Sequence, residues 1–213
     1  MGGQLVIVAL PPGYPAEWAI DAVLADCGTV HVRPIRPDDA AAHRAFFANQ
    51  SPQSVYLRFF GHRTELSDGE VDRFTTVDYH QRMAFVAFLH DEMIAIGRYD
   101  RLAGGDEAEV AFAVADAQQG RGLATLLLEY LATYAAGNGI TRFSADTLVD
   151  NRRMLDIFQA AGLRRQSRST EYGVVHLAFD IEPAGEGFRG KRLARFHRQP
   201  TRHPAGSSRI QAK

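Results

Sequence analysis

The sequence predicts a mixed α/β (α+β) domain whose sheet has about six to seven strands, mostly antiparallel, with helices on both faces. Three observations lead to this prediction. Short segments of alternating apolar residues are separated by Gly, Pro and Asp, as in strands joined by turns. One leucine-rich segment instead has the period of an amphipathic helix. Strands follow one another in the middle of the chain and alternate with helices after it, so antiparallel and parallel pairs are both expected.

The first part of the chain is expected to hold a leader, a strand and three short helices. The leader has three prolines and an apolar stretch at 18–24 that suits one short helix. The expected segments after it are a strand at 29–35 and helices that begin at Asp38, Ser51 and Ser67. Asp and Ser side chains can accept hydrogen bonds from the first turn of a helix, and Glu70 completes a capping box with Ser67.

The second part begins with two strands joined by a tight turn at Asp91-Glu92. Its leucine-rich helix has one apolar stripe, with residues at i, i+3, i+4, i+7, i+8 and i+11 from Leu123. The expected segments are strands at 83–89, 93–99, 109–115, 142–147, 163–168 and 174–181, with helices from 123 to about 136 and at 151–161.

Charge is distributed unevenly along the chain. Residues 183–213 contain eight Lys or Arg and one acid, a net charge of +7, so that residues 1–182 carry −8 of the chain's total of −1. The basic segment has three prolines and no apolar periodicity, which predicts disorder. We therefore expect a leader at 1–28, a folded domain at 29–182 and a basic tail at 183–213.

Composition argues against several classes of function. The single cysteine, Cys27, excludes an intrachain disulfide and favours a reducing compartment. The apolar run at 5–10 is too short to cross a bilayer and no basic stretch precedes it, so we expect a cytoplasmic protein without a membrane partner. The eight histidines lack metal-ligand spacing, so no metal is expected. The basic tail has no motif for reading bases, which argues against nucleic acid as a partner.

The segment 109–125 carries the clearest chemical signal. It reads E-V-A-F-A-V-A-D-A-Q-Q-G-R-G-L-A-T, a strand that leads through a glycine-bearing turn into the leucine-rich helix. Backbone N–H groups at a helix start can bind anions, and Gly120 and Gly122 allow the backbone to approach a phosphate closely. Arg121 adds a positive charge to the same loop. The segment therefore predicts a site for a pyrophosphate.

Residues Gln119-Gly120-Arg121-Gly122-Leu123-Ala124 match the Gln/Arg-x-x-Gly-x-Gly/Ala signature, and in this the chain resembles GNAT acetyltransferases. A second match is the Asn-led helix from Asn151 to Gly162-Leu163. The resemblance covers roughly residues 29–181 and implies the GNAT fold, with acetyl-CoA as co-substrate. It implies that CoA contacts the strand, the glycine loop and the second helix through Phe112, Ala113, Val114, Gln119, Gly120, Arg121, Gly122, Leu123, Ala124, Thr125 and Asn151.

Further segments narrow the resemblance to bacterial Pat-type protein lysine acetyltransferases. They are Arg58-Phe59-Phe60, residues 74–79 and residues 108–112. The segment Tyr14-Pro15-Ala16-Glu17-Trp18 also resembles relatives that are fused to a CoA-ligase. The resemblance implies an N-acetyltransferase whose acceptors are lysine side chains of proteins, acyl-CoA synthetases among them.

Glu109 is the candidate general base. A lysine amine has an unperturbed pKa of about 10.4, so only a small fraction is uncharged at pH 7, and only the free amine attacks a thioester. A carboxylate whose pKa is raised by burial can take the proton, directly or through water. Glu109 begins the strand that leads to the glycine loop, and Pat-type enzymes carry a catalytic Glu in this context. The alternative is a solvent-facing strand residue without a catalytic role.

One position departs from the GNAT pattern. Many GNAT enzymes have a Tyr seven residues after the Asn, proposed to protonate the leaving CoA thiolate, and here that position is Phe158. Another group must serve, or the thiolate leaves unassisted and is neutralised by solvent. A thiolate whose acid has a pKa near 8.5 is a tolerable leaving group, so catalysis is still expected.

Three other functions remain open from the sequence. The chain could be a GNAT enzyme for a small amine or an antibiotic, a CoA-sensing module without catalysis, or a nucleic-acid binder that uses its tail. Glu109 and the intact glycine loop favour catalysis over sensing. The sequence does not identify the acceptor amine, because GNAT specificity is determined by the variable helices before the hairpin.

Overall fold

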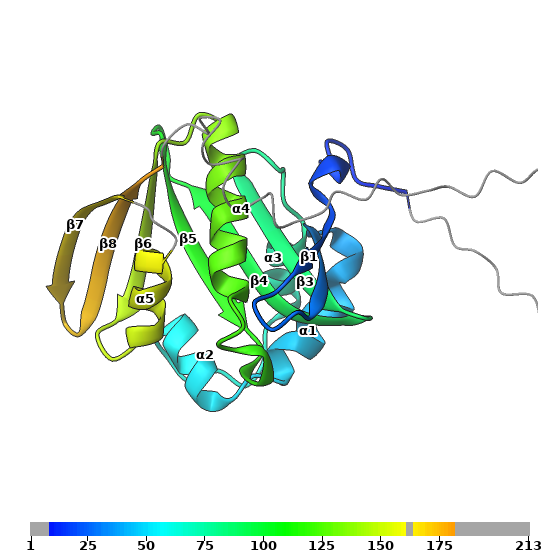
Figure 1. Cartoon of the computed structure of the whole chain (residues 1–213), viewed down its shortest axis with the longest axis horizontal. Helices are drawn as coiled ribbons and strands as arrows, with labels where there is room; N and C mark the ends of the chain where they lie inside the picture. The colour runs from blue at the N-terminus through cyan, green and yellow to red at the C-terminus, as the bar shows by residue number, and fades with distance from the viewer. Residues whose placement is uncertain (1–8, 161–163, 182–213) are drawn as a thin grey trace, which may run out of the picture.

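The computed structural model describes residues 9–160 and 164–181, which form a mixed sheet of eight strands in the order β1-β2-β3-β4-β5-β6-β8-β7, covered by helices (Figure 1). Only β5 and β6 pair in parallel; the other neighbours are antiparallel. The strands are β1 (Ile20–Val23), β2 (Thr29–Pro34), β3 (Arg82–Leu89), β4 (Glu92–Arg101), β5 (Glu107–Val114), β6 (Arg142–Leu148), β7 (Arg164–Glu171) and β8 (Val174–Asp180).

The sheet has one or two strands more than the sequence predicted. The extra strand is β1, which lies in the expected leader and pairs with β2 from Ile20↔Val32 to Val23↔Thr29. The apolar stretch at 18–24, which suggested a short helix, instead forms β1, and a single 3-10 turn, Ala16–Trp18, precedes the strand. Ala22 of this strand is completely buried in the core. A segment of four residues is too short for its pattern of apolar residues to distinguish a strand from a helix.

The α-helices of the described residues begin close to the predicted caps. They are α1 (Ala40–Ala48), α2 (Pro52–Phe59), α3 (Asp68–Thr75), α4 (Leu123–Gly137) and α5 (Arg152–Ala160). Ser51 caps α2 by accepting from the Ser54 backbone N–H, and Ser67 forms the predicted capping box with Glu70. The residue before α1 is Asp39 rather than Asp38. The Asp39 carboxylate is buried, pairs with Arg33 at 2.5 Å and accepts from the Arg36 backbone N–H.

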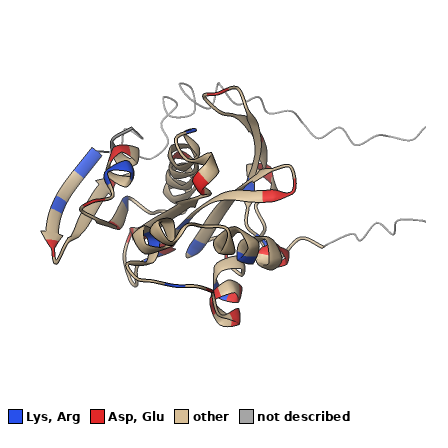
Figure 2. Ribbon diagram, turned by 90° about the horizontal axis from the view of Figure 1, so that it is seen from below, with Lys and Arg blue, Asp and Glu red and all other residues tan. Residues whose placement is uncertain are grey.

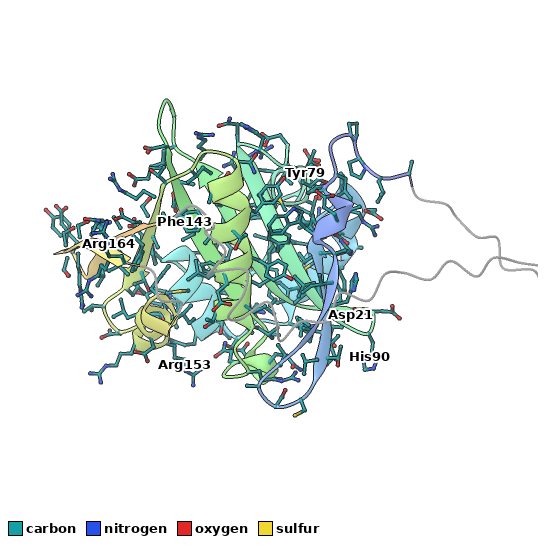
Figure 3. The ribbon with its side chains drawn as sticks, turned by 45° about the horizontal axis from the view of Figure 1, so that its top comes forward. Asp21, Tyr79, His90, Phe143, Arg153 and Arg164 are labelled. Carbon is teal, nitrogen blue, oxygen red and sulfur yellow. The ribbon has the colours of Figure 1, made fainter. Side chains whose placement is uncertain are left out.

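The helices form a layer on each face of the sheet. Helices α4 and α5 lie in front of it in the view of Figure 1, and α1, α2 and α3 lie behind. The main core lies under α4, whose leucines pack on inward-facing residues of β3 to β6 and β8. Phe143 of β6, labelled in Figure 3, is completely buried in this core. A smaller core lies on the opposite face, where Phe46 of α1 contacts Val86 and Ile96.

The N-terminal segment packs against α4. The Trp18 ring lies 5.8 Å from Phe85, 6.1 Å from Tyr130 and 5.1 Å from Tyr134, measured between ring centroids. In the β1–β2 turn, Asp26 accepts from the guanidinium of Arg121 at 2.6 Å. Residues upstream of β2 are therefore connected to both ends of α4. The basic tail, residues 183–213, lies outside the described residues.

Strand β7 forms the outer edge of the sheet and is exposed along its whole length. Figure 2 shows basic residues along it, which are Arg164, Arg165 and Arg168. Charged side chains on an edge strand discourage pairing with another chain. None of the described helices combines the length and the apolar character that a membrane-spanning helix needs.

Strands β5 and β6 separate after a short paired segment, and this opening positions the functional site. Their register contains only Glu107↔Arg142, Ala108↔Phe143 and Glu109↔Ser144, although β5 continues to Val114 and β6 to Leu148. On its other edge β5 remains paired with β4 as far as Ala95↔Val114. The β6-facing backbone groups of residues 110–114 therefore face the opening between the strands.

We expect Gly97→Ala to destabilise the fold. A Cβ at this buried position would lie 2.8 Å from the Phe112 ring and 3.1 Å from Leu127, so β5 or α4 would have to move. Overpacking of this kind costs about 1–3 kcal/mol of unfolding free energy. Urea unfolding of Gly97→Ala and of the parent protein measures the difference in unfolding free energy.

The matched control for this prediction is Gly69→Ala. A Cβ there has no atom within 4 Å, and Gly69 lies in helix α3. Because alanine favours the helix over glycine, this variant should keep or raise stability, by at most about 1 kcal/mol. Equal stability of Gly97→Ala and the parent protein would contradict the close contact between β4, β5 and α4.

Candidate active site

A cleft of about 710 Å³ lies between α2 on one side and the separated strands β5 and β6 on the other, and the starts of α4 and α5 close one end. Of the residues that the sequence assigned to the site, all except Arg121 line this cleft. They are Glu109, Phe112, Ala113, Val114, Gln119, Gly120, Gly122, Leu123, Ala124, Thr125 and Asn151.

The glycine loop has the backbone conformation that its composition suggested. Gly120 has φ = +81° and Gly122 has φ = +87°, and a Cβ built on either residue would have no atom within 4 Å. These positive φ values favour glycine, and the open space leaves room for a ligand beside the backbone. No side chain caps α4, so the N–H groups of its first turn are available to an anion at this end of the cleft.

The positive charge beside the loop comes from a residue that the sequence did not suggest. Arg121 does not line the cleft; its guanidinium binds Asp26 and Gln118 and so connects the loop to the β1–β2 turn. Arg153 lines the cleft instead, on the first turn of α5 (Figure 3), and donates to Gln119 Oε1. A regular helix after Asn151 places Arg153 here, but only the tertiary structure brings that helix beside the loop.

Asn151 uses its side chain to begin α5. Its Oδ1 accepts from the Met154 backbone N–H at 3.2 Å, which is the geometry of a helix cap. The residue also lines the cleft. Asn151 therefore fixes the start of α5, and with it the position of Arg153.

A polar network joins α2 to the segment that precedes the glycine loop. Ser51 and Ser54 donate to the Asp116 carboxylate at 2.9 and 2.6 Å, and Gln119 donates to Ser54 Oγ at 3.3 Å. Burial acts to raise the pKa of Asp116, but the hydrogen bonds from Ser54 and Ser51 outweigh it and hold that pKa below its usual value. The sequence suggested Ser51 only as a cap and did not suggest Ser54 or Asp116.

Glu109 lies at the other end of the cleft. Its neighbours Ala108 and Val110 belong to the core under α4, so by strand alternation Glu109 faces the α2 side, where it is exposed. Burial by the protein, which the sequence argument invoked for a base at this position, is therefore not found. Arg58 of α2 lines the same cleft. Burial lowers the pKa of Arg58, while the negative charges of Glu109 and Asp100 act in the opposite direction.

Two further titratable groups, Arg98 and His43, line a second cavity together with Arg58, on the α1 side of the sheet. Arg98 is 9% exposed, donates to the Phe74 carbonyl oxygen at 2.8 Å and lies over the Phe74 ring. Burial, with the added charge of Arg58, lowers the pKa of Arg98 to about 9. Burial also lowers the pKa of His43 to about 4, with help from the charge of Arg98, so this imidazole is neutral at pH 7.

Phe158 forms part of the apolar wall of the cleft. It is 1% exposed, stacks on Phe179 with 4.6 Å between ring centroids and meets Phe112 edge-on at 6.4 Å. The side chain that replaces the expected Tyr is therefore fixed among aromatic rings and has no proton to donate. Within the described residues, no group of three or more His, Cys, Asp and Glu side chains is arranged to hold a metal ion.

Comparisons with known proteins show which family this chain resembles. The family model of the acetyltransferase (GNAT) family matches residues 49–163. Acetyltransferase PA5475 of Pseudomonas aeruginosa is 34% identical over 137 residues, which cover 62% of this chain and 74% of that protein. Acetyltransferase Pat of Mycolicibacterium smegmatis is 30% identical over 159 residues, 72% of this chain but only 46% of Pat.

The solved structures include a similar domain of higher identity. The GNAT domain of S. lividans PAT is 45% identical and superposes with a TM-score of 0.74, covering 79% of this chain and 99% of that domain. The resemblance to GNAT and Pat-type proteins that the sequence suggested is thereby confirmed. Since the family model spans more than half of the chain and the fold agrees, the chain belongs to the GNAT family of acetyltransferases.

Proposed function

We propose that this protein transfers the acetyl group of acetyl-CoA to a primary amine, the side-chain amine of a protein lysine, with Glu109 as the general base. The observation that carries the proposal is that one cleft contains the glycine loop, the free edge of β5 and Glu109. An anion site, an extended edge and a carboxylate are thus arranged in the order of pyrophosphate, pantetheine and thioester in acetyl-CoA.

The proposed position of acetyl-CoA follows from the backbone. The pyrophosphate would accept hydrogen bonds from the N–H groups of the loop and the first turn of α4, with Arg153 and Gln119 beside it. The pantetheine arm would then run along residues 110–114, whose β6-facing groups are not used by β6. From Glu109 to Val114 the strand spans about 17 Å, a length that an extended pantetheine can cover.

The chemistry would be direct transfer. The amine nitrogen attacks the thioester carbonyl carbon, a C–N bond forms and the C–S bond breaks with its electron pair on sulfur. The amine proton goes to the Glu109 carboxylate, directly or through water. Because Glu109 is exposed, the acceptor and the acyl donor themselves must exclude water around it. The positive charge of Arg58 would disfavour a protonated ammonium at the same place and so favour the free amine.

The side of the cleft that α2 forms suits a lysine side chain. Leu57 and Phe60 line it beside Arg58, and Phe60 is 41% exposed. Apolar surface of this kind can bind the methylene stem of lysine. Similarity to Pat-type proteins supports a protein acceptor, with acyl-CoA synthetases as acceptor proteins to test first. The lone, exposed Cys27 supports a reducing compartment, and we propose the cytoplasm.

The alternatives differ from this proposal in their products. A GNAT enzyme for small amines or antibiotics would acetylate such compounds and leave proteins unmodified, and a CoA-sensing module would bind acetyl-CoA without turnover. Incubation of the full chain with acetyl-CoA and a panel of purified proteins and small amines, analysed by mass spectrometry, separates these outcomes. Acetylated lysine peptides support the proposal. Binding of acetyl-CoA without any acetylated product contradicts it.

We expect Gly122→Glu to weaken acetyl-CoA binding by about tenfold or more, which corresponds to roughly 1.4 kcal/mol. The new carboxylate would lie where the pyrophosphate is placed, since nothing now occupies the space beside Gly122. Calorimetric titration with acetyl-CoA measures the affinity. An unchanged affinity would show that the pyrophosphate does not bind at this loop.

The control separates this effect from backbone strain. Gly104 also has a positive φ, +76°, and open space around it, but it lies in the β4–β5 turn and does not line the cleft. Gly104→Glu introduces the same charge and a similar strain, and should bind acetyl-CoA as the parent protein does.

We expect Glu109→Gln to lower the rate of lysine acetylation at pH 7 by about 10²–10⁴-fold, with acetyl-CoA affinity nearly unchanged. The deficit should shrink as pH rises, because the amine then loses its proton without a base. Initial rates between pH 7 and pH 10 measure this dependence.

Glu107→Gln is the matched control on the same strand. Glu107 lies near Arg142, at 3.6 Å, and does not line the cleft, so its variant should keep the parent rate. A parent-like rate of Glu109→Gln at pH 7 would exclude Glu109 as the base.

A further inference from the structure

Thr147 of β6 has a buried hydroxyl group without a hydrogen-bond partner. The residue is 1% exposed, and its Oγ1 forms no hydrogen bond within residues 9–160 and 164–181. Thr147 nevertheless lines the cleft. A buried hydroxyl without a partner is unfavourable, because it has lost its hydrogen bonds to water, and a ligand in the cleft could restore one.

Another buried threonine of the chain shows the usual arrangement. Thr75 is also 1% exposed, and its Oγ1 donates to the Val71 carbonyl oxygen at 2.9 Å. A threonine in a helix can use the carbonyl oxygen one turn back, whereas a threonine in an extended strand has no carbonyl oxygen in that position. Thr147 lies on β6 beyond Ser144, the last residue paired with β5. Its hydroxyl therefore lies in the part of the cleft where the two strands have separated, without a partner among the described residues.

The surroundings of Thr147 are apolar. By strand alternation it shares a face with Ala145 and Phe143, which belong to the core under α4. Its antiparallel partner on β8 is the fully buried Val175, and Phe158 lines the same cleft. The hydroxyl groups of Ser51 and Ser54 are engaged by Asp116. Thr147 thus offers an unengaged hydroxyl inside the opening, three residues beyond the last β5–β6 pair.

From this geometry we propose that the Thr147 hydroxyl donates a hydrogen bond to the sulfur atom of the acyl donor as the C–S bond breaks. The proposal rests on the proposed function, because it places acetyl-CoA between β5 and β6, with the sulfur beside Thr147 and the acetyl group directed toward Glu109. When the amine attacks, the C–S electron pair moves to sulfur, and the thiolate accepts the hydrogen bond. A hydroxyl is a weaker acid than a thiol, so the proton stays on the threonine oxygen. The sulfur gains its own proton from solvent on release.

The hydrogen bond that the Thr147 hydroxyl donates is strongest when its acceptor is charged. Thioester sulfur is a weak acceptor, whereas a thiolate carries a full negative charge, here beside the apolar neighbours of Thr147. The interaction therefore stabilises the transition state more than bound acetyl-CoA, and it should affect the rate more than the affinity. It supplies the stabilisation that Phe158 cannot provide.

The test uses the full chain and measures the ionisation of CoA itself, so that the acceptor need not be known. Thr147→Val removes the hydroxyl and keeps the branched shape, and Thr147→Ser keeps the hydroxyl. Ultraviolet absorbance of the thiolate, followed against pH, gives the pKa of the thiol of bound CoA. We expect Thr147→Val to raise this pKa by about one unit and Thr147→Ser to keep it near that of the parent protein. The rate of acetyl transfer should fall about tenfold or more in Thr147→Val, with acetyl-CoA affinity changed less than threefold.

Thr75→Val serves as the control, because it also removes a buried hydroxyl but lies in α3, outside the cleft. It should leave the thiol pKa of bound CoA unchanged. If Thr147→Val folds and binds CoA but has the same thiol pKa as the parent protein, the proposal for Thr147 is wrong, and the proposed function stands. If the parent protein does not bind CoA, the proposed function itself fails. If only part of the Thr147→Val protein folds, the proposal is still supported when that folded fraction has a raised thiol pKa and Thr147→Ser has a normal one.

Discussion

The separation of β5 from β6 is the constraint on which the rest of the site depends. Paired parallel strands normally form backbone hydrogen bonds along their whole length, but here the ladder between β5 and β6 ends at Glu109↔Ser144. Helix α4 and the core beneath it hold β5 to β4, while β8 holds β6, so the two strands cannot close again. The result is an extended edge with free backbone groups inside the domain, where a ligand can satisfy them without unfolding anything.

Both ends of this opening are defined by interactions made elsewhere in the chain. At one end, Arg121 and Asp26 connect the glycine loop to the β1–β2 turn, and Arg153 and Gln119 line the cleft. At the other end, Glu109 and Arg58 line the cleft with opposite charges, and the charge of Glu109 acts to raise the pKa of Arg58. Helix α2 connects the two ends, because it presents Arg58 at its C-terminal turn and is held at its N-terminus by Asp116.

The cleft has two chemically different walls. The wall toward α2 carries the charged groups Glu109 and Arg58 and the hydroxyl groups of Ser51 and Ser54, which are bound to Asp116. The wall toward α4 and α5 carries Arg153 near the glycine loop and is apolar around Phe112 and Phe158, where the Thr147 hydroxyl lacks a partner among the described residues. A charged acceptor and an uncharged thioester would each meet surroundings of matching polarity. This difference follows from strand alternation, since adjacent residues of β5 and β6 point to opposite walls.

The sequence by itself determined the succession of helices and strands, the caps at Ser51 and Ser67, the glycine loop and its family resemblance. These features depend on local chemistry: a period, a capping side chain, or glycine at a positive φ. It did not reveal β1, whose four residues form a strand only because β2 lies beside them. The direction of Arg121, the exposure of Glu109, and the positions of Arg153 and Thr147 were decided by the tertiary structure alone. Each of these depends on which distant segment lies next to the residue, and neither periodicity nor composition records that neighbour.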